Sequence, residues 1–271
     1  MYQKIDFKNK QIHYRDEGKG KCIVLLHGFP ESLQIWDNFV TELQKDYRVI
    51  CVDLPGHGES DCIDEVHTME LLAEAVNNVL IKLGIEKCLM TGHSMGGYVT
   101  LEFAKQQPEK LSGIVLFHSQ AGADTETARK NRDRTIEIVN NDKIGFISFF
   151  IPDLFAEENK MKYEKEIDSL KKVASQTSAE SIIAALKGMK ERSSKIEMLG
   201  EWNFPVLFIT GKKDKRITTE MVLAQIGLPK HGEALILEKA GHMGFIEAKT
   251  ETLETIKSFA HKSFLLDEIK S

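Results

Sequence analysis

One serine of this chain stands between glycines where a strand is expected to meet a helix. Gly92-His93-Ser94-Met95-Gly96-Gly97 follows the apolar run 88–90 and precedes a stretch of helical character, 98–107. A Gly-x-Ser-x-Gly pattern in this setting holds a serine hydroxyl on a sharp turn, where it can act as a nucleophile. The pattern therefore predicts acyl transfer at Ser94. The alternative is that Ser94 is an ordinary turn residue.

A histidine and an aspartate later in the chain could activate this hydroxyl. A serine is a weak nucleophile unless a base takes its proton, and the base in turn needs an orienting carboxylate. His242 lies between glycines in a loop after the last strand-like run, and Asp214 follows the strand-like run before it. Serine, then aspartate, then histidine is one of the chain orders in which this trio occurs. We therefore expect Ser94 as nucleophile, His242 as base and Asp214 as acid.

Other polar residues compete for these roles. Asp214 could instead cap a loop, because aspartate is common in turns. The loop after the strand-like run that ends at Phe117 has no carboxylate before Asp124, so Asp214 is the better candidate for the acid. His118 in that loop is either a structural residue or a pocket residue. Four further histidines are interpreted as surface residues: His13, His67, His231 and His261.

A carbonyl oxygen that gains charge during such a reaction needs preorganised donors, commonly two backbone N–H groups. The residue after the nucleophile, Met95, can supply one at the start of a helix, whose dipole favours an anion. The loop His27-Gly28-Phe29-Pro30 follows the apolar run 22–26, and the N–H of Phe29 is the candidate for the second. Phe29 and Met95 are therefore the expected oxyanion hole.

Alternating strands and helices must position these residues. Continuous apolar runs predict strands buried on both faces, and the stretches between them have helical spacing. The expected strands are 5–7, 12–15, 22–26, 47–52, 88–90, 113–117, 206–209 and 234–237. The expected helices around them are 36–43, 69–83, 98–107, 219–226 and 248–264. The fold class is therefore α/β, with a mostly parallel sheet of about eight strands flanked by helices.

The alternation stops in the middle of the chain. Residues 122–202 read helical, polar and rich in Lys and Glu, which predicts a helical cap inserted into a core formed by 1–121 and 203–271. Thr177-x-x-Glu180 has the spacing of a capping box at a helix start. Aromatic residues within 146–155 either pack the cap on the core or line an acyl pocket.

Composition narrows the classes of partner. The chain has 271 residues and a net charge of −5, so no basic excess points to nucleic acid or to an anionic membrane. The N-terminus lacks the apolar segment of a secretory leader, and no apolar stretch approaches the ~20 residues of a membrane span. No Cys-x-x-Cys occurs, so neither a zinc site nor a redox pair is indicated. We expect a cytoplasmic protein that acts on a small molecule, with no metal and no organic cofactor.

Five motifs in this order resemble the serine-dependent α/β-hydrolases that carry a helical cap. They are the loop 27–30, the loop Asp53-Leu54-Pro55-Gly56-His57-Gly58-Glu59-Ser60, the serine turn 92–97, Gly211-x-x-Asp214 and Gly241-His242. The resemblance implies the α/β-hydrolase fold, a triad of Ser94, His242 and Asp214, and a carboxylesterase that cleaves a small or medium ester through an acyl-enzyme.

The same resemblance leaves other reactions open. Phe29-Pro30-Glu31 resembles the oxyanion loop of epoxide hydrolases, but those relatives and the haloalkane dehalogenases carry Asp at the position of Ser94. An alkyl-enzyme is therefore disfavoured. C–C bond hydrolysis, cyanohydrin cleavage and perhydrolysis are alternatives on the same triad. A non-catalytic ligand receptor is a further alternative, against which the retention of every triad residue argues. The insertion after Gly122 is expected to select the substrate.

Overall fold

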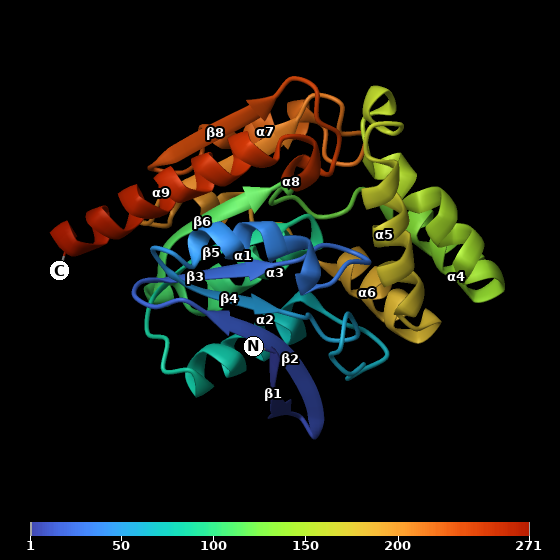
Figure 1. Ribbon diagram of the computed structural model, residues 1–271, viewed down its shortest axis with the longest axis horizontal. Coiled ribbons are helices and arrows are strands. Elements are labelled where there is room, and N and C mark those ends of the chain that lie inside the picture. The colour runs from blue at the N-terminus through green and yellow to red at the C-terminus, as the bar shows by residue number, and fades with distance from the viewer. Residues whose placement is uncertain (1, 271) are drawn as a thin grey trace.

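The computed structural model describes residues 2–270, and these form one eight-stranded sheet with helices on both faces (Figure 1). The sheet order is β1-β2-β4-β3-β5-β6-β7-β8. The strands are β1 (Tyr2–Phe7), β2 (Lys10–Glu17), β3 (Cys22–Leu26), β4 (Arg48–Val52), β5 (Cys88–His93), β6 (Leu111–Phe117), β7 (Val206–Gly211) and β8 (Gly232–Leu237). The pairs β1/β2 and β2/β4 are antiparallel and all other neighbours are parallel. The predicted mostly parallel sheet is thus confirmed.

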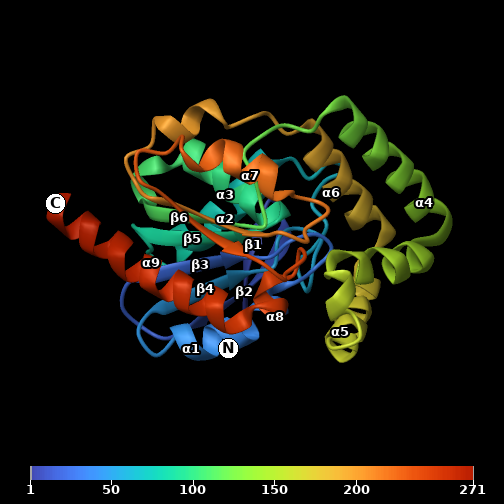
Figure 2. The ribbon, with the colours of Figure 1, turned by 90° about the horizontal axis from the view of Figure 1, so that it is seen from above.

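Helices cover the two faces of the sheet. Figure 2 shows one layer with α2 (Met69–Lys82), α3 (Met95–Gln106) and α7 (Thr219–Ile226). The opposite layer holds α1 (Asp37–Leu43), the short α8 (Gly244–Glu247) and the long α9 (Lys249–Lys270). Strands β3, β5, β6 and β7 are buried along their whole length, because each packs against helices on both sides. None of the described helices has both the length and the apolar character needed to cross a membrane.

Three further helices lie between β6 and β7 in the chain and stand together beyond one end of the sheet (Figures 1 and 2). They are α4 (Glu126–Phe150), α5 (Glu164–Gln176) and α6 (Ala179–Glu191). Helix α4 is interrupted at Asp142, where φ is −151° and ψ is 80°. We propose on this arrangement that 122–202 is the cap and that 1–121 and 203–271 form the core; residues 1 and 271 lie outside the described range.

Two details of the sequence interpretation are wrong. The hydroxyl of Ser178 accepts the N–H of Ser181 at the start of α6, so Ser178 and not Thr177 is the N-cap. Thr177 ends α5 instead, in an extended conformation. His67, expected at the surface, is fully buried because α6 packs over it, and its N–H donates to the carbonyl of Ala184.

The topology brings the ends of neighbouring strands to one edge of the sheet. Ser94 follows β5, His118 follows β6, and Asp214 lies three residues after β7. His242 lies in the loop after β8. Because β5 to β8 are parallel neighbours, these four residues emerge side by side beneath the cap.

Candidate active site

Ser94 occupies a strained turn between β5 and α3. Its φ is 49° and its ψ is −112°, values that a residue with a side chain adopts only at a cost of about 1–3 kcal/mol. The N–H of Ser94 donates to the carbonyl of Phe117 at 2.9 Å, which fixes the turn to β6. A Cβ on Gly92 would lie 2.2 Å from the Gly96 carbonyl oxygen, and a Cβ on Gly96 would lie 2.6 Å from that of His27. The turn therefore needs glycine at both positions.

Asp214 and His242 form a buried hydrogen-bonded pair. Nδ1 of His242 donates to Oδ2 of Asp214 at 2.7 Å. The other oxygen, Oδ1, accepts the N–H groups of Arg216 at 2.8 Å and Ile217 at 3.0 Å. Burial raises the pKa of Asp214, but its electrostatic interaction with His242 and the hydrogen bonds from two histidines outweigh burial and hold this pKa well below its usual range. An ionised Asp214 thus orients His242, so that Nε2 remains free to take a proton.

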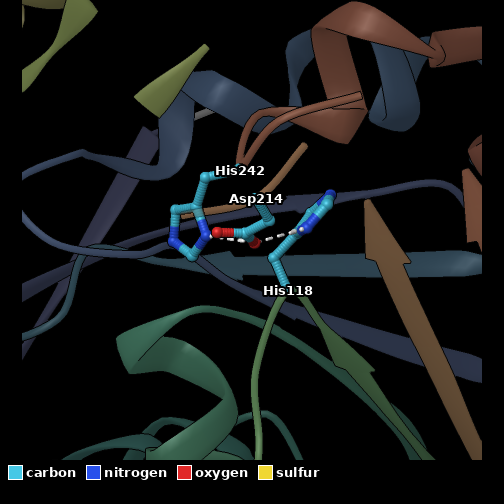
Figure 3. Close-up of side chains that lie close together, drawn as sticks. All are labelled: His118, Asp214 and His242. Atoms are coloured by element: carbon cyan, nitrogen blue, oxygen red, sulfur yellow. Dashed lines mark hydrogen bonds and ion pairs between the residues drawn. The ribbon is translucent and has the colours of Figure 1, made fainter. Parts of the chain in front are cut away.

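The second histidine on Asp214 is His118 (Figure 3). Its Nδ1 donates to Oδ2 of Asp214 at 3.0 Å, and its Nε2 accepts the N–H of Gly244 at 3.2 Å. Because one ring nitrogen donates and the other accepts, the ring is neutral, and burial lowers its pKa to about 4. His118 lies behind the carboxylate and not in the cavity wall, so it is a structural residue that supports Asp214.

His118, Asp214 and His242 are also close enough together to be a possible metal-binding group. Their hydrogen bonds account for this closeness. Both Nδ1 atoms that face Asp214 carry protons in this pattern, and the remaining nitrogen of His118 accepts the N–H of Gly244. The donor set therefore fits an orienting network better than a metal site.

A buried pair that the sequence interpretation missed lies beneath the serine. Nδ1 of His93 donates to Oε2 of Glu31 and Nε2 donates to the carbonyl of His242, both at 2.9 Å. Oε2 of Glu31 also accepts the N–H of Gly28 at 2.7 Å. Burial lowers the pKa of His93, but the Glu31 carboxylate outweighs it, so the net pKa is raised, while that of Glu31 is lowered. A His93–Glu31 ion pair thus connects the loop at Gly28, the serine turn and the His242 loop.

The two oxyanion candidates lie at the serine. Met95 begins α3, and the first N–H groups of a helix have no acceptor inside that helix. Phe29 lines the same cavity as Ser94 and His242. The N–H of Gly28 is used by Glu31, which leaves the next N–H in the loop, that of Phe29, for an oxyanion.

The cavity above Ser94 has a volume of about 340 Å³ and is enclosed by both core and cap. Phe150 and Leu186 of the cap supply apolar wall, and Phe150 packs edge-on against Phe29 with ring centroids 5.7 Å apart. Phe149 has 82% of its surface exposed and points away from this site. The aromatic segment therefore contributes to the cavity through Phe150 and not through Phe149.

Comparisons with known proteins bear on the family and the fold. A model of the family described as "alpha/beta hydrolase fold" matches residues 21–249. The chain is similar to the 2-hydroxy-6-oxononadienedioate/2-hydroxy-6-oxononatrienedioate hydrolase of Paraburkholderia phymatum, at 28% identity over 86% of this chain and 84% of that protein. It is also similar to the (E)-2-((N-methylformamido)methylene)succinate hydrolase of Acinetobacter baylyi, at 23% identity over 93% of this chain and 94% of that one.

Among solved structures, a thermophilic esterase from Thermogutta terrifontis, described with malate bound, is similar at 30% identity and a TM-score of 0.89. That likeness covers 94% of each chain. The segment that the family model matches, 21–249, includes the serine turn, the Asp214 loop and the His242 loop. It contains strands β3 to β8 of the sheet. The chain belongs to the α/β-hydrolase fold family.

Proposed function

We propose that this α/β-hydrolase cleaves a small or medium carboxylic ester through an acyl-enzyme on Ser94. The observation that carries the proposal is the arrangement of three side chains. Ser94 and His242 face one cavity, and Asp214 holds Nδ1 of His242 at 2.7 Å from behind. This is the arrangement that activates a serine hydroxyl.

The reaction has two halves. In the first, Nε2 of His242 takes the Ser94 proton while Oγ attacks the ester carbonyl, and the protonated ring then gives this proton to the leaving alcohol. In the second, a water molecule is the nucleophile. His242 takes its proton as it attacks the acyl carbonyl, and the protonated ring then returns a proton to Oγ of Ser94 as the acid leaves. Asp214 stays ionised throughout and stabilises the transient charge on His242.

The oxyanion of each tetrahedral intermediate is assigned to the N–H groups of Met95 and Phe29. Met95 adds the positive end of the α3 dipole, and the Glu31–His93 pair supports the Phe29 loop through Gly28. Loss of one such donor costs about 2.7–4 kcal/mol of transition-state stabilisation in comparable sites.

A second candidate is hydrolysis of a C–C bond beside a ketone. The substrate in the name of the Paraburkholderia phymatum relative has an oxo group and no ester. The similar solved structure from Thermogutta terrifontis, in contrast, is an esterase. The triad serves both reactions, so the identity of the scissile bond depends on the cavity. We favour the ester because the likeness to the esterase has the higher identity and the wider coverage of this chain.

The test is turnover of a p-nitrophenyl ester series from acetate to octanoate by the wild type, Ser94→Ala and the exposed control Ser148→Ala. We expect Ser94→Ala to lose about 10³-fold or more in kcat/KM, and Ser148→Ala to match the wild type. Equal rates for wild type and Ser94→Ala would refute the proposal. If the wild type cleaves a vinylogous diketone but none of these esters, the second candidate replaces the first.

We also propose a cytoplasmic location and a small-molecule substrate. The four cysteines, all free thiols in the structure, support a reducing compartment. The cavity volume of about 340 Å³ suits a small molecule.

A further inference from the structure

We infer that the substrate carries a free carboxylate, which Arg192 and Arg132 of the cap bind within the cavity above Ser94. The inference rests on the proposed function, since it names the substrate class of the same site. It comes from charges in the cavity wall that the hydrolytic mechanism does not use.

The cavity wall is cationic although the chain as a whole is acidic. Its charged residues are one carboxylate and four basic side chains: Asp124, Arg132, Arg192, Lys215 and Arg216. The whole chain has a net charge of −5. A wall of this sign concentrates anions in a cleft and disfavours cations. The cationic wall is therefore a local feature of the site and not a consequence of composition.

Two of these arginines share a single carboxylate. Asp124 accepts hydrogen bonds from Nε of Arg132 and from Nη1 of Arg192. Burial raises the pKa of Asp124, but Arg132 and Arg192 outweigh it, so the net pKa is lowered and Asp124 stays ionised. Two cations on one anion leave one positive charge in excess.

Arg192 is the more buried of the two arginines, with 6% of its surface exposed. Its guanidinium lies over the ring of Tyr98, 3.9 Å from the centroid, and Nη1 also donates to the carbonyl of Met189 at 2.8 Å. Among the described residues its Nε is buried without an acceptor, and no hydrogen bond engages Nη2. Unused N–H groups on a buried cation are costly, so Nη2, which is not closed off as Nε is, indicates a place for a ligand oxygen.

Neighbouring acidic residues do not cancel the excess charge. Glu102, on the adjoining helix α3, is engaged by Lys195 at 2.7 Å and Lys105 at 3.1 Å. On the other side of the cavity, Asp153 lies 2.9 Å from Arg216 and 3.4 Å from Lys215. That group again has two cations on one anion.

The two groups differ in burial, which decides where the carboxylate binds. Arg216 and Lys215 are half-exposed and belong to the mouth of the cavity, where they attract anions. Arg192 and Arg132 lie deeper, beside Leu186 and Met189. Desolvation strengthens an ionic hydrogen bond there. We therefore place the carboxylate on the Arg192 side and the ester carbonyl at Ser94.

The test compares two esters that differ by one charge. They are the mono-p-nitrophenyl ester of glutaric acid and the same compound with its free acid methylated. We expect the wild type to prefer the charged ester by about tenfold or more in kcat/KM, the size of one ionic hydrogen bond. Arg192→Met is expected to lower this preference at least about tenfold, and Arg192→Lys to recover part of it.

Arg134→Met is the matched control, because Arg134 lies on α4, the helix that also carries Arg132, but is exposed and does not line the cavity. It should keep both the rate and the preference. Arg132→Met provides a second variant should Arg192→Met fold poorly, and it should also reduce the preference. A wild type that cleaves both esters equally, or a preference that survives both substitutions, would overturn the inference and leave the proposed function standing.

Binding to Ser94→Ala separates the two claims. Calorimetry should detect glutarate but not the neutral glutaramide, and Arg192→Met in the same background should abolish glutarate binding. Arg192-dependent glutarate binding without any ester turnover would support the anion site and count against the ester reaction. Equal behaviour of glutarate and glutaramide would overturn the anion site.

Discussion

At the scale of single residues, His118 explains how Asp214 is held as the orienting acid. The carboxylate accepts four hydrogen bonds, two from histidines through Oδ2 and two from backbone N–H groups through Oδ1. Each donor to an ionised group contributes about 1.5–3 kcal/mol. We therefore propose that His118 is a positioning residue that acts on the reaction through Asp214 and His242.

Replacing His118 should affect the chemical step and spare substrate binding. We expect His118→Leu to lower kcat about tenfold or more, because Asp214 loses a donor and holds His242 less firmly. KM should stay within about twofold, since His118 does not line the cavity. Steady-state kinetics on one ester would measure both.

His118→Asn provides the control, because its amide can still donate to Asp214. It should recover most of the lost kcat. A rise in KM at unchanged kcat in His118→Leu would instead mean that His118 contacts the substrate.

The sequence interpretation proposed Ser94, Asp214 and His242 as a triad and missed the residues that support them, for a physical reason. Ser94, Asp214 and His242 stand in recognisable loops at strand ends, so their meeting follows from a parallel sheet. The partners of His118 and Glu31 depend on how the loop at Gly244 and the loop at Gly28 fold back on the site. No spacing in the sequence encodes those contacts. Polar residues at the ends of neighbouring strands, as at His118, are the only signal.

At the scale of elements, the site depends on how closely β5 meets α3. The first turn of α3 packs against the end of β3, which leaves no room for a side chain at Gly92 or Gly96. This close approach sets the φ of 49° at Ser94. The turn is therefore a property of the packing between three elements and not of the serine alone.

A methyl group at Gly92 should disturb this packing. We expect Gly92→Ala to destabilise the fold by about 3 kcal/mol, the upper end of ordinary overpacking, because the new Cβ would lie 2.2 Å from a carbonyl oxygen. Urea unfolding monitored by circular dichroism would measure the change. Gly227→Ala is the control, since a Cβ there meets nothing within 4 Å. Equal stability of the two variants would contradict the close packing.

The buried Glu31–His93 pair joins three loops, and its loss should be felt in all of them. We expect Glu31→Gln to destabilise the protein by about 3 kcal/mol or more, because His93 then keeps a buried charge without its partner. Activity should fall as well, because Gly28 and His242 are held through this pair. Thermal unfolding and ester turnover would test both, with Glu59→Gln, at an exposed carboxylate of the loop 53–60, as control. Unchanged stability and activity would count against the pair.

The elements themselves could be predicted well where the apolar pattern was strong. The strand expected at 22–26 is confirmed to the residue, and so is the helix at 219–226. The strand expected at 88–90 runs on to His93. The prediction stopped short because residues 91–93 are polar or glycine, although they are buried and pair with β6. The error at Thr177 came from two adjacent residues that can both cap a helix.

At the scale of the whole molecule, buried neutral histidines make the fold sensitive to acid. Burial lowers the pKa of His27 to about 3 and those of His57, His67 and His118 to about 4. In the unfolded chain each would titrate near 6.5. Between these values the unfolded state binds more protons than the folded state, so stability rises with pH through this window and falls on acidification.

Carboxyls whose pKa is raised by burial work against this trend, namely Asp53, Asp37 and Glu247. Burial raises the pKa of Asp53 to about 6, so between about pH 4 and 6 the folded state holds its proton and the unfolded state does not. Near pH 5 the four histidines and Asp53 together leave about three extra protons on the unfolded chain. This corresponds to about 4 kcal/mol of stability per pH unit.

The free energy of unfolding should therefore drop steeply between pH 6.5 and pH 5. Urea titrations at half-unit steps would measure it. His67→Gln should reduce the slope by about 1.4 kcal/mol per pH unit, since it removes one of these protons. A free energy that is flat across this range would show that the histidines are not buried and neutral.

The central claim is that Ser94 is the nucleophile, and covalent labelling tests it most directly. Incubation with a fluorophosphonate, followed by intact-mass and peptide mass spectrometry, should show one adduct per chain, located on Ser94. Ser94→Ala should show none, and His242→Ala should react far more slowly because the hydroxyl has lost its base. An adduct on another residue, or undiminished labelling of Ser94→Ala, would contradict the account.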